Sequence, residues 1–186
     1  MSRPSQVIVL AEDQRQQMLI RRYPRKKGLS FHQLRFTPLH QGEGSGEQRV
    51  RQSYPAEIRA WRRRQAKALT ALIVVIDADT RTVEDRLGQL AETLRHSEIK
   101  PVDPNTERVA RLVPRRNVET WILCLNGETV DEEIDYKGTR SDWDQLIRPA
   151  AESLNEWTRP NVELPTYCVY SLRRGVSELI HLSFET

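Results

Sequence analysis

The sequence predicts an α/β fold in which a small, mostly parallel sheet is flanked by helices. The first indication is the run of residues 72–76, five apolar residues of which four are β-branched, which is typical of a strand buried on both faces. The second is the alternation of short apolar runs with longer segments of helical periodicity. The third is the length of 186 residues, which suits one domain with a full core.

The elements can be placed in order along the chain. Strands are expected at residues 7–10, 31–39, 71–76 and 108–113, and helices at residues 14–27, 47–67, 80–94, 118–125 and 142–157. Pro24 is expected to kink or end the first helix, and Pro55 either opens a second helix within residues 47–67 or bends it. Residues 42–46 and 127–141 are expected to form loops, and residues 166–170 and 176–182 are left without a type.

Composition and charge narrow the class of protein. The hydrophobic content of 38% and the charged content of 30% are those of a polar chain that can still fold. The formal net charge of +3 is only mildly basic, yet two clusters, at residues 15–27 and 49–67, concentrate the cations. Such an asymmetry can steer a polyanion to one face, although either cluster alone equally suits a solvated helix face.

The cysteines and the apolar runs exclude several classes. Cys124 and Cys168 have no metal-type spacing, so neither a disulfide framework nor a zinc site is expected, and each is interpreted as a small buried hydrophobe. No signal peptide is expected, because the first apolar run is short and ends at Glu12. No apolar run approaches the ~20 residues that span a bilayer, so we expect a cytoplasmic chain without a membrane segment.

Acidic residues follow the expected strands. Glu12 and Asp13 end the first strand, Asp77 and Asp79 end the third, and Glu119 lies near the start of the helix after the fourth. The carboxyl ends of parallel strands share one edge, where ligands of open α/β sheets bind. Strand alternation would place Asp77 and Asp79 on the same side. Carboxylates held this close repel unless one is protonated or a cation lies between them, and Mg²⁺ prefers such oxygen ligands.

A structural role remains open for each acidic residue taken alone. Asp79 could cap the following helix, which would leave Asp77 in a loop. Glu119 could complement the helix dipole, and Glu12 could pair with Arg15. Because three separate segments contribute carboxylates to one edge, we favour a functional role for the set.

The order of these motifs resembles the TOPRIM domain of topoisomerases, primases and overcoming-lysogenisation-defect nucleases. The resemblance is carried by the hydrophobic strand that ends in Glu12 (residues 7–12) and the one that ends in Asp77-Ala78-Asp79 (residues 73–79). Residues 114–123 are similar to a further motif of small stand-alone TOPRIM-like proteins, which often lie beside ATPase partners in antiphage systems. The resemblance implies a single TOPRIM-like, Rossmann-like domain over residues 1–186, with a core at about 7–125 and a helical or irregular extension at about 126–186.

The resemblance also implies an activity, namely Mg²⁺- or Mn²⁺-dependent hydrolysis of phosphodiester bonds in DNA or RNA, as the effector of a defence system with an ATPase partner. It implies that Glu12 acts as a base or a metal ligand and that Asp77 and Asp79 bind the metal. Glu119 would be a further ligand or lie just behind the ligands. One position departs from the family, because Asp13 stands where TOPRIM domains usually have glycine, and its side chain could crowd a phosphate or add a ligand.

Basic residues are the expected contacts to the nucleic acid. Arginine binds phosphate in a bidentate manner, and Arg62, Arg63 and Arg64 are consecutive within the cluster of residues 49–67. Lys137 could reach the scissile phosphate from the polar loop, although solvation is the simpler interpretation of a lone lysine there.

Two other classes of protein remain open. The first is a response-regulator receiver, with Asp77 as the phosphorylated residue and Lys100-Pro101 as its lysine–proline pair. The 64 residues from Asp13 to Asp77 are more than the short βαβ interval of a receiver, which argues against this class.

The second is a non-catalytic TOPRIM-like subunit that docks on an ATPase. Exposed tryptophans would suit such an interface, and the candidates are Trp121, Trp143 and Trp157. Tryptophans at helical spacing belong more often to a core.

Overall fold

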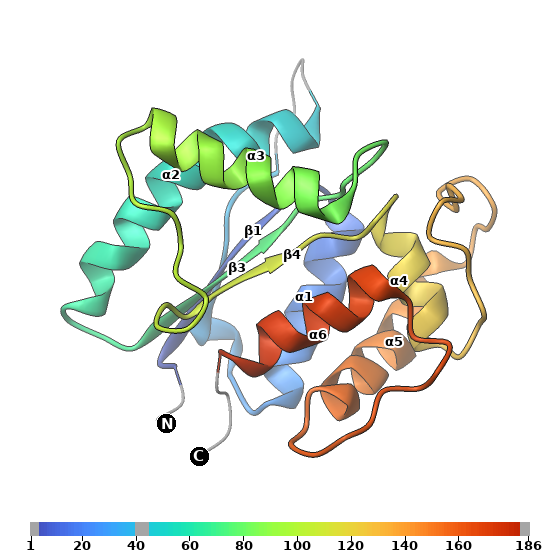
Figure 1. Cartoon of the computed structure of the whole chain (residues 1–186). Coiled ribbons are helices and arrows are strands. Elements are labelled where there is room, and N and C mark those ends of the chain that lie inside the picture. Colours follow the sequence, from blue (N-terminus) through green and yellow to red (C-terminus); the bar gives the residue numbers. More distant parts are fainter. Residues whose placement is uncertain (1–3, 40–44, 183–186) are drawn as a thin grey trace.

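A four-stranded, all-parallel sheet lies at the centre of the structure (Figure 1). This computed structural model describes residues 4–39 and 45–182. The strands are β1 (Gln6–Ala11), β2 (Leu34–Phe36), β3 (Thr70–Val75) and β4 (Val109–Leu112). Their order is β2-β1-β3-β4. The predicted α/β class with a small parallel sheet is therefore confirmed.

The strand order changes direction once, between β1 and β3. The chain passes from β1 to β2 on one side, crosses back to β3 on the other, and then adds β4 beyond β3. The carboxyl ends of β1 and β3 lie side by side, since Ala11 pairs with Val75. Such a switch point is where open α/β sheets bind their ligands.

Helices cover both faces of the sheet (Figure 1). One face carries α2 (Gly46–Gln65) and α3 (Val83–His96). The other face carries α1 (Gln14–Lys26), α4 (Val118–Leu125), α5 (Trp143–Trp157) and α6 (Tyr170–Ile180). The crossovers through α1 and α2 run in opposite directions along the sheet, and right-handed connections then place these helices on opposite faces.

Alternate residues of the central strands enter two separate cores. Val9 of β1 and Ile73 of β3 pack in the cluster that includes α1, α4, α5 and α6. Leu10 and Leu72 pack in the cluster that includes α2 and α3. Every residue of β3 is buried, which confirms the interpretation of its apolar run as a strand covered on both faces.

Three prolines lie inside helices of the described residues, and two of them, Pro24 and Pro55, are in positions where the sequence left a kink, an end or a bend open. Pro24 lies within α1, which continues to Lys26. Pro55 lies in the middle of α2, so this segment is one helix and no second helix begins there. Both prolines are buried. The burial of each helix face against the sheet therefore offsets the hydrogen bond that a proline removes.

The second strand is shorter than predicted. Phe31–Gln33 forms a short 3₁₀ helix, η1, and only the residues of β2 pair with β1. The reason lies in Ser30, whose backbone N–H donates to Oε1 of Gln33 at 2.9 Å. The backbone N–H of Gln33 donates back to the carbonyl of Ser30 at 3.1 Å, which closes a turn where the sequence pattern predicted a strand.

The segments after α4 pack in the same core as the sheet. Ile147 of α5 and Leu172 of α6 belong to the cluster formed by one face of β1 and β3. Gly175 of α6 approaches Trp121 of α4 so closely that an added Cβ would overlap the indole ring. The residues that the sequence left unassigned near 166–182 thus include a helix that packs against β4 and α4.

The tryptophans and cysteines are buried. Trp121, Trp143 and Trp157 have exposed fractions of 1%, 2% and 9%, so they form part of the core and not an exposed interface. Cys124 and Cys168 are free thiols and buried, and they donate to the carbonyls of Tyr167 and Val169 at 3.6 and 3.7 Å. The interpretation of the cysteines as small buried residues is confirmed.

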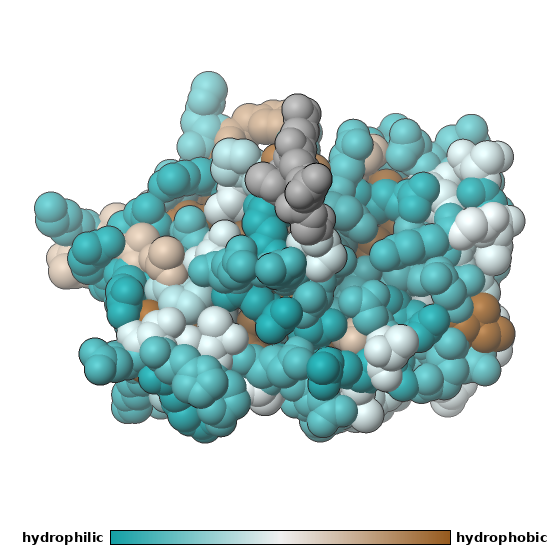
Figure 2. Space-filling view, turned by 90° about the horizontal axis from the view of Figure 1, so that it is seen from above, coloured by the Kyte–Doolittle hydropathy of each residue, from teal (hydrophilic) through white to brown (hydrophobic). Residues whose placement is uncertain are grey.

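Figure 2 shows the molecule from above the view of Figure 1. The surface on this side is largely hydrophilic, and its hydrophobic residues form separate spots. Such scattered residues are normal for a protein surface. Within the described ranges, no helix combines the length and the apolar character that crossing a bilayer requires.

Candidate functional site

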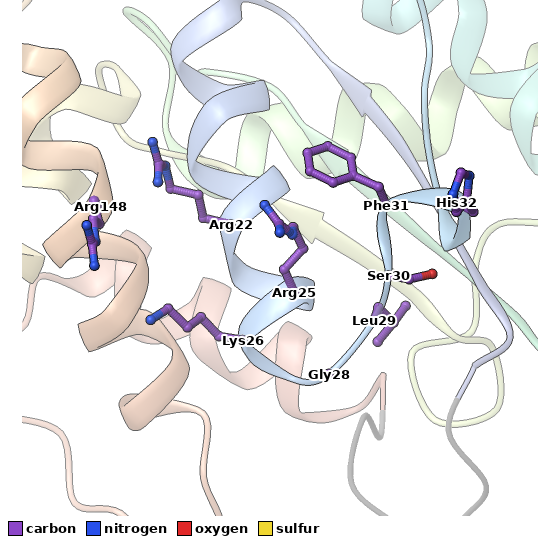
Figure 3. A pocket seen from close by; sticks show the side chains of 9 residues that line it. All are labelled: Arg22, Arg25, Lys26, Gly28, Leu29, Ser30, Phe31, His32 and Arg148. Atoms are coloured by element: carbon purple, nitrogen blue, oxygen red, sulfur yellow. The ribbon is translucent and has the colours of Figure 1, made fainter.

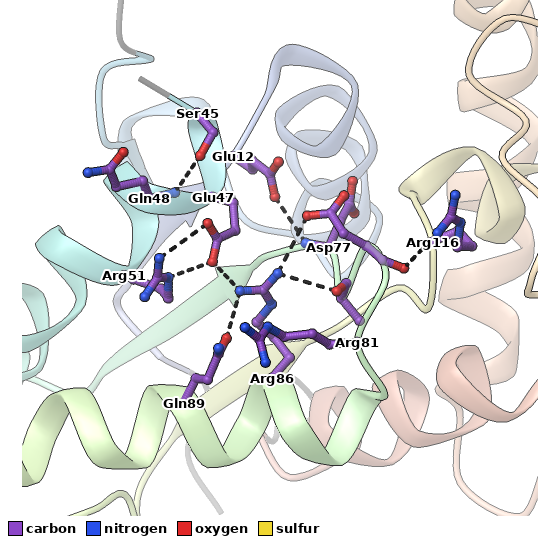
Figure 4. A network of polar contacts seen from close by, with 12 residues as sticks. Glu12, Ser45, Glu47, Gln48, Arg51, Asp77, Arg81, Arg86, Gln89 and Arg116 are labelled. Carbon is purple, nitrogen blue, oxygen red and sulfur yellow. Dashed lines mark hydrogen bonds and ion pairs between the residues drawn. The ribbon is translucent and has the colours of Figure 1, made fainter. Parts of the chain in front are cut away.

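Glu12 and Asp77 meet at the switch point of the sheet. Glu12 directly follows β1, and Asp77 lies two residues after β3. The backbone N–H of Asp77 donates to Oε2 of Glu12 at 3.0 Å (Figure 4). The side chain of Asp77 is fully buried, and that of Glu12 is partly buried. The structure therefore brings together the glutamate after the first strand and the first aspartate of the Asp-x-Asp motif.

Two other segments contribute polar groups to Asp77. Nε2 of Gln16 in α1 donates to Oδ1 of Asp77 at 2.9 Å. Nζ of Lys137 lies 3.5 Å from Oδ2, which otherwise has no hydrogen-bond partner among the described residues. Gln16 also accepts, through Oε1, the backbone N–H of Glu12 at 2.8 Å. This one glutamine thus links the ends of both strands.

Burial disfavours the charged form of both carboxylates. It raises the pKa of Glu12 to about 7, against the hydrogen bond from Asp77, with the nearby charge of Asp79 adding to the rise. It also raises the pKa of Asp77 well above its usual range, and the charge of Glu12 adds to this effect. Burial lowers the pKa of Lys137, but the facing carboxylates of Asp77 and Glu12 raise it on balance. The charged forms of these two carboxylates, which have only one ammonium group beside them, would be stabilised by a further cation.

Asp79 lies in the turn that follows Asp77. It has a φ of 57°, in the left-handed region that aspartate tolerates better than most residues. Its Oδ2 lies 3.4 Å from Nη2 of Arg86, and its carbonyl accepts from Arg115 at 3.2 Å and Arg116 at 3.3 Å. Arg86 and Arg116 are labelled in Figure 4. The strand alternation therefore stops before the motif ends, and the half-exposed side chain of Asp79 lies at the rim of the site.

Glu119 lies beside Glu12 and Asp77, but its charge is balanced by an arginine. It is buried in the first turn of α4 and pairs with Arg15 of α1. The guanidinium of Arg15 also lies 5.6 Å from the ring centroid of Trp143. The charge of Glu119 contributes to the raised pKa of Asp77. The alternative in which Arg15 pairs with Glu12 does not occur, since Arg15 is the partner of Glu119.

The helix caps give Asp13 a structural role and exclude the capping role that was open for Asp79. Asp13 is the N-cap of α1, and its Oδ1 accepts the backbone N–H of Gln16 at 2.9 Å. This role gives a physical reason for an aspartate where the resemblance leads one to expect glycine. Thr82, rather than Asp79, caps α3, and its hydroxyl accepts the backbone N–H of Asp85 at 3.0 Å.

A chain of hydrogen bonds holds the loop of Lys137 over the site. Asn117 caps α4 as predicted, by accepting the backbone N–H of Thr120 at 3.4 Å. Its Nδ2 donates to Oδ1 of Asp135 at 2.7 Å, and the same oxygen accepts the backbone N–H of Lys137 at 2.9 Å. The polar loop is thereby tied to the start of α4, and Lys137 reaches Asp77 from it.

The first turn of α2 covers Glu12 from the other side. A Cβ on Gly46 would lie 2.6 Å from Cγ and from the carbonyl oxygen of Glu12, so only glycine fits this approach. Arg49 donates to the carbonyls of Pro38 and Ala11. Burial lowers the pKa of Arg49, and the charge of Glu12 opposes that shift.

The predicted nucleic-acid contacts lie in two separate places. Lys137 lies in the site. Arg62, Arg63 and Arg64 lie in the last turn of α2, just before β3 begins, and therefore at the opposite edge of the sheet. Arg62 forms hydrogen bonds with both carboxylate oxygens of Glu107, at 2.6 and 2.9 Å. The structure does not bring this arginine cluster to the acidic pair.

Glu12 and Asp77 are the residues that fit a metal ion best. In the part of the chain that the structure describes, no group of three or more His, Cys, Asp or Glu side chains is arranged to hold a metal. Mg²⁺, however, is commonly bound by one or two carboxylates together with substrate phosphates and water. Oδ2 of Asp77, buried and without a hydrogen bond from any described residue, and the adjacent carboxylate of Glu12 provide such a pair.

Sequence reasoning missed Gln16 and the arginine partners of Asp79 and Glu119. A signal for Gln16 was present, because the spacing Asp13-x-x-Gln16 is related to a helix capping box, in which the residue at the fourth position bonds back toward the cap. Arg15 and Glu119 are 104 residues apart, so their pairing leaves no local pattern, whereas Arg86 is only seven residues from Asp79.

The fold and the site together define the class of this molecule. It is an α/β domain with a buried pair of carboxylates, faced by a lysine, at the switch point of a parallel sheet. No family model, curated protein or solved structure matches the chain.

Proposed function

We propose that this protein hydrolyses phosphodiester bonds in nucleic acid with a divalent cation, Mg²⁺ or Mn²⁺, held by Glu12 and Asp77. The observation that carries the proposal is the contact between these residues at the switch point, where Asp77 N–H donates to Glu12 at 3.0 Å and Lys137 faces Asp77 at 3.5 Å. The resemblance of the motif order to TOPRIM domains supports the same activity. On that resemblance rests the further proposal of an ATPase partner in a defence system.

The donor set suits a hard cation. Both carboxylates present oxygen ligands, and both are held in a buried place where their charge is costly without a counterion. A bound divalent ion polarises the phosphoryl oxygen and lowers the pKa of a bound water. Proton transfer and the binding of the substrate phosphate are left to the side chains of the site.

Glu12 and Lys137 have the properties that the reaction needs. The carboxylate of Glu12 lies at the proposed position of the cation, which would favour its charged form, so Glu12 can accept the proton of an attacking water. Lys137 is 41% exposed and charged, so its ammonium can bind a phosphate oxygen of the substrate while it faces Asp77. Gln16 holds Asp77 in position through its hydrogen bond at 2.9 Å.

Cleavage by an Asp77→Asn variant tests the proposal. We expect wild-type protein with Mg²⁺ or Mn²⁺ to cut plasmid DNA or tRNA, and the variant to lose at least about a hundredfold in rate, because one carboxylate ligand is removed. The asparagine keeps the oxygen that accepts from Gln16, so thermal unfolding should show a folded variant.

The matched control is Glu163→Gln, which removes one negative charge from an exposed carboxylate after α5. Its rate should equal that of the wild type. Equal rates for Asp77→Asn and Glu163→Gln would show that Asp77 takes no part in the reaction and would contradict the proposal.

One observation favours a second candidate, a phosphoacceptor of the receiver type. The ion pair between Lys137 and Asp77 places a lysine beside the aspartate that would be phosphorylated. Lys100, which the sequence suggested for this role, lies between α3 and β4, at the edge where strands begin. The 64 residues from Asp13 to Asp77, which exceed the short βαβ interval of a receiver, favour the hydrolase. Labelling of Asp77 by acetyl phosphate, without cleavage of nucleic acid, would favour the phosphoacceptor instead.

A further inference from the structure

A basic pocket lies at the end of α1 opposite the acidic pair. It has a volume of about 680 Å³, which is within the usual range of ligand pockets. Figure 3 shows it between α1, α5 and the segment that leads into η1. The residues that line it are Arg22, Arg25, Lys26, Gly28, Leu29, Ser30, Phe31, His32 and Arg148.

The lining is strongly cationic. Four of its side chains carry a permanent positive charge, and no carboxylate is among the described residues that line it. Glu152 at its border pairs with Lys26 at 2.9 Å and with Arg148 at 3.6 Å. Arg22 forms no ion pair within the described ranges and projects toward the pocket in Figure 3. Like charges gathered in this way favour an anionic ligand.

An exposed aromatic ring adds a flat apolar surface. Phe31 is 50% exposed, and the guanidinium of Arg25 lies 4.3 Å from its ring centroid. The ring and the guanidinium plane are both surfaces on which nucleobases stack. The pocket therefore offers partners for a phosphate and for a planar base in the same place.

The pocket and the acidic pair lie at the two ends of one helix. Asp13, the N-cap of α1, adjoins Glu12, and Lys26 at the last turn lines the pocket. The 13 residues of α1 span about 20 Å, at a rise of about 1.5 Å per residue. At the duplex rise of about 3.4 Å, this length corresponds to roughly six nucleotides, and to fewer when a strand is extended.

We propose that this pocket binds a single-stranded segment of nucleic acid, with a base against Phe31 and phosphates on Arg22, Arg25 and Arg148. The inference deepens the proposed function and rests on it, because it assigns the pocket to the strand whose cleavage takes place at the other end of α1. A lipid headgroup would supply phosphate but no planar base. A single strand supplies both in every repeat, which matches a lining that combines cations with an exposed ring.

Fluorescence anisotropy of a labelled oligothymidylate of about twelve nucleotides, a length within the site sizes of single-strand binders, tests the assignment. The full chain is used in EDTA, so that binding is measured without cleavage. Arg22→Glu/Arg148→Glu should weaken binding at least about tenfold and reduce the slope of log K against log salt by about 1.4, because two phosphate contacts to a single strand are lost. Phe31→Ala should weaken binding roughly tenfold through loss of stacking.

The matched control is Arg95→Glu/Lys100→Glu, which makes the same charge change on exposed residues in the last turn of α3 and just after it. At physiological salt it should change binding by less than about threefold, because screening limits distant charges. Thermal unfolding of each variant confirms that it is folded.

Three results would overturn the assignment. The first is equal loss of binding in the two double variants. The second is displacement of the oligonucleotide by thymidine monophosphate at equal concentration, which would show a mononucleotide site. The third is capture of the protein by phosphatidylserine vesicles, lost in Arg22→Glu/Arg148→Glu, with no binding of the oligonucleotide. None of these results affects the cleavage comparison at Asp77, so this inference and the proposed function can fail separately.

Discussion

At the scale of single residues, the protonation of Glu12 makes the stability of the fold depend on pH. Burial raises its pKa from 4.5 to about 7, so the folded protein holds this proton more tightly than the unfolded chain does. The stabilising effect is therefore complete below about pH 4.5 and is lost as the pH rises through about 7. Asp77 has a raised pKa as well and acts in the same direction.

In the Glu12→Gln variant, the free energy of unfolding should depend less on pH than in the wild type. In EDTA, the free energy of unfolding of the wild type should fall by about 2–3 kcal/mol between pH 4.5 and 7 through Glu12. The variant should lose this contribution and be more stable than the wild type at pH 8, since glutamine can still accept the Asp77 N–H. Urea unfolding at a series of pH values measures both. Parallel curves for the two proteins would mean that Glu12 does not titrate in this range.

At the scale of elements, the position of α6 depends on its close approach to α4. Gly175 lies against the ring of Trp121, whose indole N–H donates to the hydroxyl of Ser171 at 2.6 Å. These contacts attach the C-terminal helix to the helix that carries Glu119. Leu172, Val176 and Leu179 of this helix recur at helical spacing and are buried. The sequence did not assign the helix, because it was divided into two short segments, residues 166–170 and 176–182.

Two glycine-to-alanine substitutions test this contact, one expected to destabilise the fold and the other to stabilise it. Gly175→Ala should destabilise the fold by about 1–3 kcal/mol, because the added methyl overlaps the Trp121 ring. Gly88→Ala in α3, where no described atom lies within 4 Å of the added methyl, should stabilise it by up to about 1 kcal/mol through helix propensity. Chemical unfolding of both variants gives the comparison. Similar values for the two would show that α6 does not pack closely on α4.

At the scale of the whole molecule, the sequence predicted the sheet and half of the site. The parallel strands followed from short apolar runs that end in turns, and Glu12 and Asp77 followed from their positions at strand ends. Asp79 lies in the turn after β3 with a left-handed backbone, which strand alternation cannot anticipate, and its carboxylate lies 3.4 Å from Arg86. The partnership of Lys137 with Asp77 depends on how a long loop folds back, which no local pattern encodes.

The central claim is that Glu12 and Asp77 form one divalent-cation site, and a Mn²⁺ titration followed by electron paramagnetic resonance tests it most directly. The wild type and Glu163→Gln should each bind about one ion per chain, as expected for a pair of carboxylates completed by water. Asp77→Asn should bind at least about tenfold more weakly, as expected when a metal site loses a supporting group. Absence of saturable Mn²⁺ binding by the wild type, or equal affinity in Asp77→Asn, would contradict the claim.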